Sequence, residues 1–206
     1  MKYESVKALY YITSKSNLAS IFQNGICSHD RASGLTHDSI AKPEVQKIRA
    51  RKRVPGSQGR PLHEYVNLYF NPRNPMLFLM KENHENLVVL DVDKEVMKRQ
   101  GVAISDYNAA KTYTAFHPYP EGIEALDESL VFARYWVNQI EDLGDPFAAD
   151  RRKAATQAEV LVPDLIEPQM IKGVIVSCKS VAADLRTSGP KAVYRVDPNL
   201  FFRVKA

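Results

Sequence analysis

One carboxylate lies inside the apolar run Ala158-Glu159-Val160-Leu161-Val162-Pro163, and this feature constrains the chain most strongly. With the period of two that a strand imposes, Val160 and Val162 share one face, and Glu159 and Leu161 share the other. A carboxylate on a mostly buried strand costs free energy unless a cation or a ligand compensates its charge. Glu159 is therefore either a functional group or the partner of an arginine in a structural ion pair.

Size and composition predict one globular domain over residues 1–206, with 45% hydrophobic and 25% charged residues. No apolar run approaches the roughly 20 residues of a membrane helix, and the first residues lack the apolar core of a signal peptide. Cys27 and Cys178 lie far apart without metal-ligand spacing. We therefore expect buried free thiols in a reducing compartment, and a cytoplasmic location without a membrane partner.

Positive charge is concentrated between Lys42 and Arg60, where Glu44 is the only acid, and again at Arg151-Arg152-Lys153. Such segments bind polyphosphates, either nucleic acid or the pyrophosphate of a cofactor, but they also form solvated helix faces. Aromatic residues follow the first segment at Tyr65, Tyr69 and Phe70. This combination favours phosphate contact together with base stacking.

Periodicity and turn residues predict a mixed α+β domain, because the strands are too scattered for regular βαβ alternation. We expect strands at 9–13, 66–70, 76–80, 87–92, 159–162, 171–177 and 192–195. We expect helices at 16–22 (closed by Gly25), 43–53, 126–143 (around Trp136, expected in the core) and 180–185. Residues 54–61 contain two glycines and two prolines and should form a mobile loop.

Glycine-rich dinucleotide, P-loop and H-E-x-x-H motifs are all absent from the sequence. The five histidines are not spaced as metal ligands, so no metal is expected: His29, His37, His63, His84 and His117. The sequence therefore disfavours a classical dinucleotide-binding fold and a zinc enzyme.

Six segments, in order along the chain, resemble the DarT family, the DNA ADP-ribosyltransferase toxins of bacterial toxin–antitoxin pairs. The resemblance extends from about Tyr10 to Phe202. The segments are Tyr10–Thr13 before a helix, the arginine-rich Ile48–Val54, His63–Leu77, Asp106–Ala109, Ala133–Trp136 and Gln157–Val162.

The resemblance implies an ADP-ribosyltransferase-like fold, a split and twisted β core with NAD+ in the cleft between its halves. Family members use NAD+ as co-substrate, expel nicotinamide and attach ADP-ribose to a base of single-stranded DNA. The expected partners are single-stranded DNA and a macrodomain-type antitoxin that removes the modification. Because this cleft needs no glycine-rich motif, NAD+ binding is compatible with the sequence.

The family's catalytic glutamate corresponds to Glu159, and its arginine over the NAD+ to one of Arg49, Arg51 and Arg53, with Arg51 preferred. Cleavage of the ribose–nicotinamide bond builds positive charge on the anomeric carbon, which a carboxylate stabilises. The same carboxylate can remove a proton from the accepting base. The planar fork of an arginine suits a pyrophosphate.

The remaining assignments follow from the same resemblance. The cofactor-binding candidates are Tyr11, Thr13, Asn17, Gly25, Arg49 and Arg51. Many relatives have histidine where Tyr11 stands, so Tyr11 is either a ribose contact or a core aromatic. The DNA-binding candidates are Tyr69, Arg73, Asn74, Met76, His117 and Arg53. Tyr69 and Met76 fit core packing better, whereas Arg73-Asn74 in a proline-bounded turn fits substrate contact better.

The block Tyr65–Asn71 is slightly closer to the guanine-modifying branch of the family than to the thymine-modifying branch. Two other functions stay open. One is an ADP-ribosyltransferase acting on RNA, protein or a small molecule. The other is a nucleic-acid binding module without activity, in which Glu159 only pairs with a cation.

Overall fold

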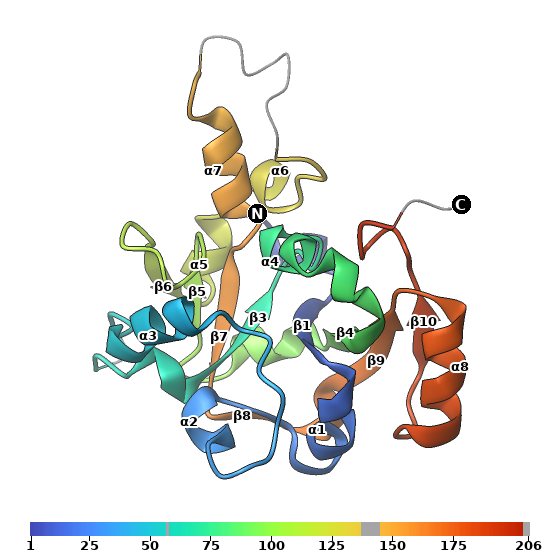
Figure 1. The fold of residues 1–206 in the computed structure, drawn as a ribbon. Helices are drawn as coiled ribbons and strands as arrows, with labels where there is room; N and C mark the ends of the chain where they lie inside the picture. The colour runs from blue at the N-terminus through green and yellow to red at the C-terminus, as the bar shows by residue number, and fades with distance from the viewer. Residues whose placement is uncertain (57, 137–144, 204–206) are drawn as a thin grey trace.

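The computed structural model describes residues 1–56, 58–136 and 145–203, and a single sheet of eight strands runs through them (Figure 1). The strand order is β10-β9-β4-β1-β3-β7-β5-β6, with β9 and β10 parallel and all other neighbouring strands of this sheet antiparallel. The strands are β1 (Leu9–Ser14), β3 (Tyr65–Tyr69), β4 (Leu87–Val92), β5 (Ala103–Ser105), β6 (Phe116–Pro118), β7 (Glu159–Pro163), β9 (Ile171–Val176) and β10 (Tyr194–Val196). A separate ribbon pairs β2 (Ile26–Cys27) with β8 (Leu165–Ile166).

The sheet is split in its middle, between β1 and β3. These two strands pair only at Tyr10 and Tyr69. Their outer neighbours pair along full strands, β1 with β4 from Leu9 to Ser14 and β3 with β7 from Tyr65 to Tyr69. Because β1 and β3 diverge beyond one contact, side chains from both strands border the gap. The α+β architecture with a split β core is thus confirmed.

Both faces of the sheet are covered, as the burial of β7 shows. Val160 and Val162 lie in the largest buried cluster, whereas Leu161 belongs to a different cluster on the opposite face. The alternation expected for this strand is therefore confirmed. Glu159 shares the face of Leu161 and is 0% exposed.

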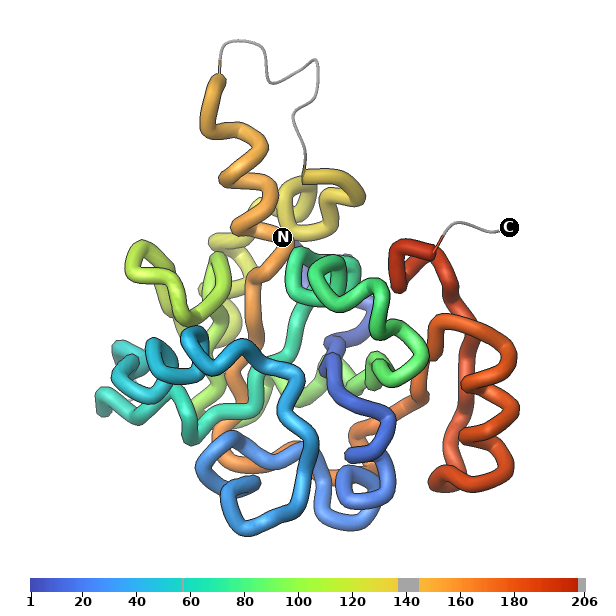
Figure 2. The backbone as a smooth tube through the Cα atoms, in the orientation of Figure 1, coloured from blue at the N-terminus to red at the C-terminus, as the bar shows by residue number. Residues whose placement is uncertain are grey.

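Helices and short 3-10 segments surround the sheet, with α1 and α8 contributing to its largest core cluster. The α-helices are α1 (Leu18–Asn24), α2 (His29–Ala32), α3 (Pro43–Arg51), α4 (Pro75–Leu79), α5 (Glu121–Glu124), α6 (Glu128–Val131), α7 (Ala148–Ala155) and α8 (Lys179–Ser188). The tube in Figure 2 shows the pale-blue segment between α2 and α3 crossing in front of β3, next to β1. In the part of the chain described, no helix is long and apolar enough to cross a membrane.

Two predicted elements are wrong. Residues 75–79 form α4 instead of a strand, because the Asn74 side chain accepts hydrogen bonds from the Met76 and Leu77 amides and Pro75 occupies the first turn. The apolar run of α4 is compatible with the periodicity of a strand and with that of a helix, so the Asn74 cap determines that the segment is helical. The helix expected over 126–143 is confined to α6, which Asp127 caps, and 132–136 are not helical. Residues 137–143 lie outside the described residues.

Smaller differences concern other segments. β10 begins at Tyr194, two residues later than expected, and the short strands β2, β5, β6 and β8 were not predicted. In the segment expected to be a mobile loop, the Val54 amide donates to the Arg60 carbonyl. Cys27 and Cys178 are free, as expected, but only half-buried. Trp136 is half-buried and contacts Phe78 and Phe202 at the surface, outside the core clusters.

The cap of α4 generates a stability prediction. We expect Asn74→Ala to lower the free energy of unfolding by about 1 kcal/mol, because two helix amides and the Asn71 carbonyl lose their partner. Urea denaturation measures this, with Asn86→Ala as the control, since Asn86 is exposed and bonds only Asn83. Equal midpoints for both variants would refute the capping role.

Candidate active site

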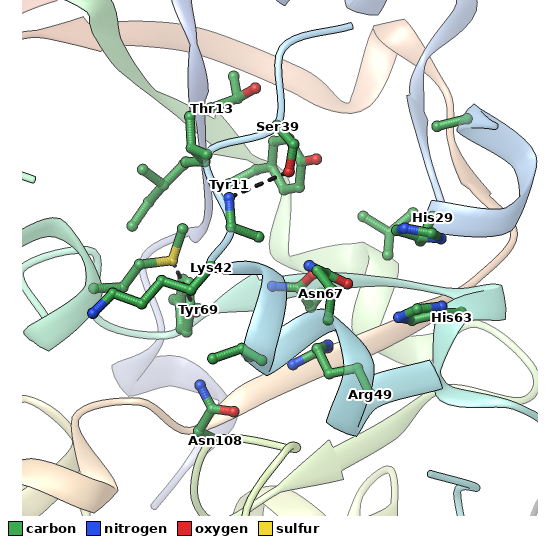
Figure 3. A pocket seen from close by; sticks show the side chains of 18 of the residues that line it. Tyr11, Thr13, His29, Ser39, Lys42, Arg49, His63, Asn67, Tyr69 and Asn108 are labelled. Atoms are coloured by element: carbon green, nitrogen blue, oxygen red, sulfur yellow. Dashed lines mark hydrogen bonds between the residues drawn. The ribbon is translucent and has the colours of Figure 1, made fainter. Parts of the chain in front are cut away.

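A cavity of about 280 Å³ opens where β1 and β3 diverge. Tyr11 and Thr13 from β1 border one side of it, and Arg49 and Asn108 lie across from them (Figure 3). β3 contributes Tyr65, Asn67 and Tyr69, which share one face of that strand, and Val66 also borders the cavity. The cavity therefore depends on the split in the sheet.

Glu159 and Arg49 form a buried, two-pronged ion pair beside this cavity. Arg49 Nη1 lies 3.2 Å from Glu159 Oε1, and Nη2 lies 3.1 Å from Oε2. The Glu159 side chain is 0% exposed and that of Arg49 is 8% exposed. Burial lowers the pKa of the Arg49 guanidinium, but Glu159 raises it more, so the net pKa lies above its ordinary value. Arg49 is therefore charged, and its contact with Glu159 fixes α3 over β7.

Glu159 has a second, neutral partner. The backbone amide of Ala109 donates to Glu159 Oε1 at 3.1 Å, from the turn that follows β5. Glu159 stands directly opposite Tyr69 on β3 and Ser105 on β5. The Ala109 amide therefore adds a further hydrogen bond to the carboxylate that Arg49 already contacts. The carboxylate is thus held at a fixed orientation by two separate elements.

Asn17 fastens the segment between α2 and α3 across the cavity. Its amide nitrogen donates to the Asp38 carbonyl at 2.9 Å and to Thr13 Oγ1 at 3.0 Å, while its oxygen accepts from the Asp38 amide. Ser39 and Lys42, which follow Asp38, then line the cavity. Asn17 thereby joins two of its walls.

The phenols of Tyr11 and Tyr69 both face this buried environment. Burial raises the pKa of Tyr11 to about 12, with a smaller contribution from Cys27. Burial also raises the pKa of Tyr69, and the negative charge of Glu159 raises it further. Both phenols are therefore neutral near pH 7 and available as hydrogen-bond donors; Tyr69 uses its hydroxyl toward the Met76 sulfur at 3.3 Å.

Two histidines that lie far apart in the sequence meet at the edge of the cavity. The rings of His29 and His63 stack with centroids 4.0 Å apart and planes 24° apart. Burial, and then the neighbouring His29, lower the pKa of His63. With Asp30 they form one of two groups, among the residues that the structure describes, whose ligand atoms lie within 4.8 Å of one another; the other is His84, Glu85 and Cys178. The lone pair of an imidazole nitrogen lies in the plane of its ring. In two stacked, nearly parallel rings, the lone pairs therefore lie in separate parallel planes and do not converge on one ion.

The cavity brings together several predicted cofactor residues: Tyr11, Thr13, Asn17 and Arg49. Arg51, the preferred arginine, is exposed on α3 and does not border it. Gly25 does not border it either; this residue closes α1 at φ 84°, and a Cβ there would lie 2.5 Å from the Ile166 carbonyl oxygen. The geometry thus favours Arg49 over Arg51 and gives Gly25 a backbone role.

The predicted DNA-binding residues are divided among different places. Tyr69 and Met76 border the cavity, whereas Arg73 lies outside it against Phe202. Asn74, the cap residue of α4, is fully buried. The other two lie elsewhere: Arg53 is exposed and donates to the Gly59 carbonyl, and His117 is half-buried on the edge strand β6.

Sequence reasoning missed several residues of this site. Lys42, Gln46, Asn67, Asn108 and Gln157 line the cavity, and the Ala109 amide bonds Glu159. Asn108, Ala109, Asn67 and Gln157 occur in segments that carried the family resemblance, which was a usable signal. Ser39 and His29 carried no such signal. His63 lies in the resembling segment His63–Leu77, but only the fold stacks its ring on that of His29.

The ion pair generates a contrast between neighbouring arginines. We expect Arg49→Ala to lower the free energy of unfolding by about 3–5 kcal/mol, because Glu159 is left charged and buried. Arg51→Ala, two residues away and exposed, should change it by less than about 0.5 kcal/mol. Chemical denaturation at pH 7 measures both. Similar losses in the two variants would contradict this account of the site.

Comparisons with known proteins agree with this geometry. The model of a family described as "ssDNA thymidine ADP-ribosyltransferase, DarT" matches residues 10–202. A "DNA ADP-ribosyl transferase-DNA ADP-ribosyl glycohydrolase fusion protein" of Thermosipho africanus is 30% identical over 95% of this chain and 50% of the relative. The chain thus spans about half the length of that fusion protein. A DNA ADP-ribosyl transferase of Thermus aquaticus is 29% identical over 87% of this chain and 79% of the relative.

Solved structures show the same fold. Thermus sp. 2.9 DarT in complex with ADP-ribosylated ssDNA superposes with a TM-score of 0.81, covering 97% of this chain and 98% of that chain at 23% identity. The same protein in complex with NAD+ gives a TM-score of 0.76 at 23% identity, over 97% and 99% of the two chains. The chain therefore belongs to the DarT family, as the resemblance in its sequence predicted.

Proposed function

We propose that this protein transfers ADP-ribose from NAD+ to a base of single-stranded DNA, with release of nicotinamide and without a metal. The buried Glu159 beside the cavity, held by Arg49 and the Ala109 amide, is the observation that carries the proposal. The family description and the neighbours solved with NAD+ and with ADP-ribosylated ssDNA support it.

Glu159 is the proposed catalytic carboxylate. In the reaction, the bond between C1′ of the ribose and the nicotinamide nitrogen breaks, and its electron pair leaves with nicotinamide. The positive charge that develops at C1′ is stabilised by the ionised Glu159. A ring nitrogen of the base then bonds to C1′, and its proton passes to Glu159. A carboxylate fixed before the substrate arrives needs little reorganisation for either task.

Arg49 replaces Arg51 as the proposed arginine of the reaction centre. Its guanidinium borders the cavity and holds the Glu159 carboxylate in a fixed orientation. Tyr11, Thr13 and Asn17 remain the proposed contacts of NAD+, and Lys42 supplies an exposed cation at the cavity for its pyrophosphate. Arg51 and Arg53, both exposed, suit the DNA phosphates instead.

Thymine is the proposed target base. The description of the matching family names thymidine. This outweighs the slight similarity of the block Tyr65–Asn71 to the guanine-modifying branch. Tyr69 and Met76 lie where the cavity is bordered by α4, and they are the proposed contacts of the base. Thymine differs from guanine in its methyl group and in its pattern of donors and acceptors, which such contacts can distinguish.

The wider biological role rests on the same reaction. We propose a single transferase domain that acts in the cytoplasm, where NAD+ and DNA are available, as the toxin of a toxin–antitoxin pair. The fusion relative combines a transferase with a DNA ADP-ribosyl glycohydrolase, so the proposed partner is a hydrolase of that class, of macrodomain type.

A direct test uses two matched single-stranded oligonucleotides, one with thymine but no guanine and one with guanine but no thymine. Incubated with NAD+, the first should gain one ADP-ribose by intact mass, and the second should not. Glu159→Gln should slow the transfer by about 100-fold or more, because the substitution removes both the proton acceptor and the negative charge of the carboxylate. NAD+ consumption with no gain on any DNA would redirect the proposal to RNA, protein or a small molecule. Without consumption, only a binding module would remain.

Expression in a bacterial host tests the toxin role. The intact chain should arrest growth, and co-expression of an active DNA ADP-ribosyl glycohydrolase should restore it, because the hydrolase removes the modification. Glu159→Gln, checked for folding by circular dichroism, should be harmless and serves as the control. Unimpaired growth with soluble wild-type protein, verified by immunoblot, would count against a toxin.

A further inference from the structure

An aromatic platform lies beside α4, outside the cavity, and consists of Arg73, Phe78, Tyr135, Trp136 and Phe202. Three of its rings contact one another edge to face. The ring centroids of Phe78 and Phe202 are 5.0 Å apart, those of Trp136 and Phe202 are 5.7 Å apart, and those of Phe78 and Trp136 are 6.0 Å apart. The residues come from three separate parts of the chain, so only the folded protein brings them together.

Arg73 holds the platform together. Its Cζ lies 4.1 Å from the ring centroid of Phe202 and 5.7 Å from that of Tyr135. Its Nε donates to the Asn199 carbonyl at 3.2 Å, and its Nη1 donates to the Arg134 carbonyl at 2.6 Å. The guanidinium therefore ties the segments around residues 134 and 199 to the start of α4. A surface fixed in this way loses little conformational freedom when a ligand binds.

The platform is accessible, and within the described residues its cations form no ion pair with a carboxylate. Phe78 is 39% exposed and Tyr135 is 53% exposed. Lys81 Nζ lies 4.5 Å from the Phe78 ring, and Arg134 Cζ lies 5.6 Å from the Tyr135 ring. Among the described residues, no carboxylate oxygen lies within 4.0 Å of Arg73, Lys81 or Arg134. Exposed rings beside uncompensated cations match the bases and phosphates of a single nucleic-acid strand.

The platform also adjoins the proposed site of reaction. α4 presents Pro75, Met76 and Leu79 to the cavity and carries Phe78 among the platform rings. We propose that the platform binds the DNA strand next to the modified nucleotide, with flanking bases stacked on its rings and phosphates near its cations. This inference rests on the proposed function and adds to it a second site, which anchors the strand while one base enters the cavity.

Binding without NAD+ tests the platform directly. Fluorescence anisotropy would compare a short oligonucleotide around one thymine with versions extended by a few nucleotides on either side. For the wild type, extension on one side should tighten binding by about 5- to 100-fold per stacked base. Abasic positions in that extension should remove the gain. Tyr135→Ala should also remove the gain in affinity, whereas Tyr135→Phe should retain it, because the aromatic ring stacks on the base.

Two further variants separate stacking from charge and from general surface effects. Lys81→Gln should weaken binding to all extended strands and reduce its salt dependence, while the difference between abasic and intact extensions persists. Tyr113→Ala is the matched control: Tyr113 is 60% exposed but follows β5, near the other end of the sheet, and it should keep the full gain. Since Tyr135 is exposed, its truncation leaves no cavity, and thermal melting should match the wild type.

The platform proposal is overturned if Tyr135→Ala and Phe78→Ala, both folded, retain the gain on extension, or if Tyr113→Ala loses as much. ADP-ribose transfer measured by mass on the same oligonucleotides reports on the proposed function separately. If the wild type transfers ADP-ribose and the platform variants keep the gain in affinity on extension, only the platform proposal is rejected. Absence of transfer to every DNA rejects the proposed function, whatever the binding data show.

Discussion

The ion pair between Arg49 and Glu159 is the interaction on which the site depends. A carboxylate with 0% exposure is costly unless its charge is compensated, and the two-pronged contact with Arg49 and the Ala109 amide provides that compensation. The same contacts join α3, β7 and the turn after β5 at one point. The pair is thus both structural and positioned for chemistry, so the two interpretations of Glu159 from its sequence do not exclude each other.

The split between β1 and β3 provides the space that this pair needs. The two strands meet only at Tyr10 and Tyr69, and the gap beyond that contact is lined by polar and aromatic side chains from both. Asn17 closes one side by binding the Asp38 backbone. A cavity made from diverging strands and a fastened segment explains how a chain without a glycine-rich motif can form a site lined by polar and aromatic side chains.

Two groups of cations near the cavity have different surroundings. Arg49 is buried against the carboxylate, whereas Arg51 and Arg53 on the same basic segment face solvent. Arg73, Lys81 and Arg134 lie by exposed aromatic rings on the other side of the cavity. A strand that met both surfaces would pass over the cavity between them, which is the geometry that modification of one base within a continuous strand demands.

The sequence by itself determined the α+β class, the alternation of β7 and the family, because these depend on local periodicity and on short motifs that a chain carries without its fold. It also identified Glu159, since a lone acid in an apolar strand is visible in the order of residues. It did not identify α4, whose apolar run is compatible with a strand until the side chain of Asn74 caps its amides. Nor did it select Arg49 over Arg51, because a helix turns neighbouring residues in different directions and only packing against β7 decides which one meets the carboxylate. The stacked histidines, the Ala109 amide and the aromatic platform are contacts between distant segments, and only the tertiary structure brings such segments within reach of one another.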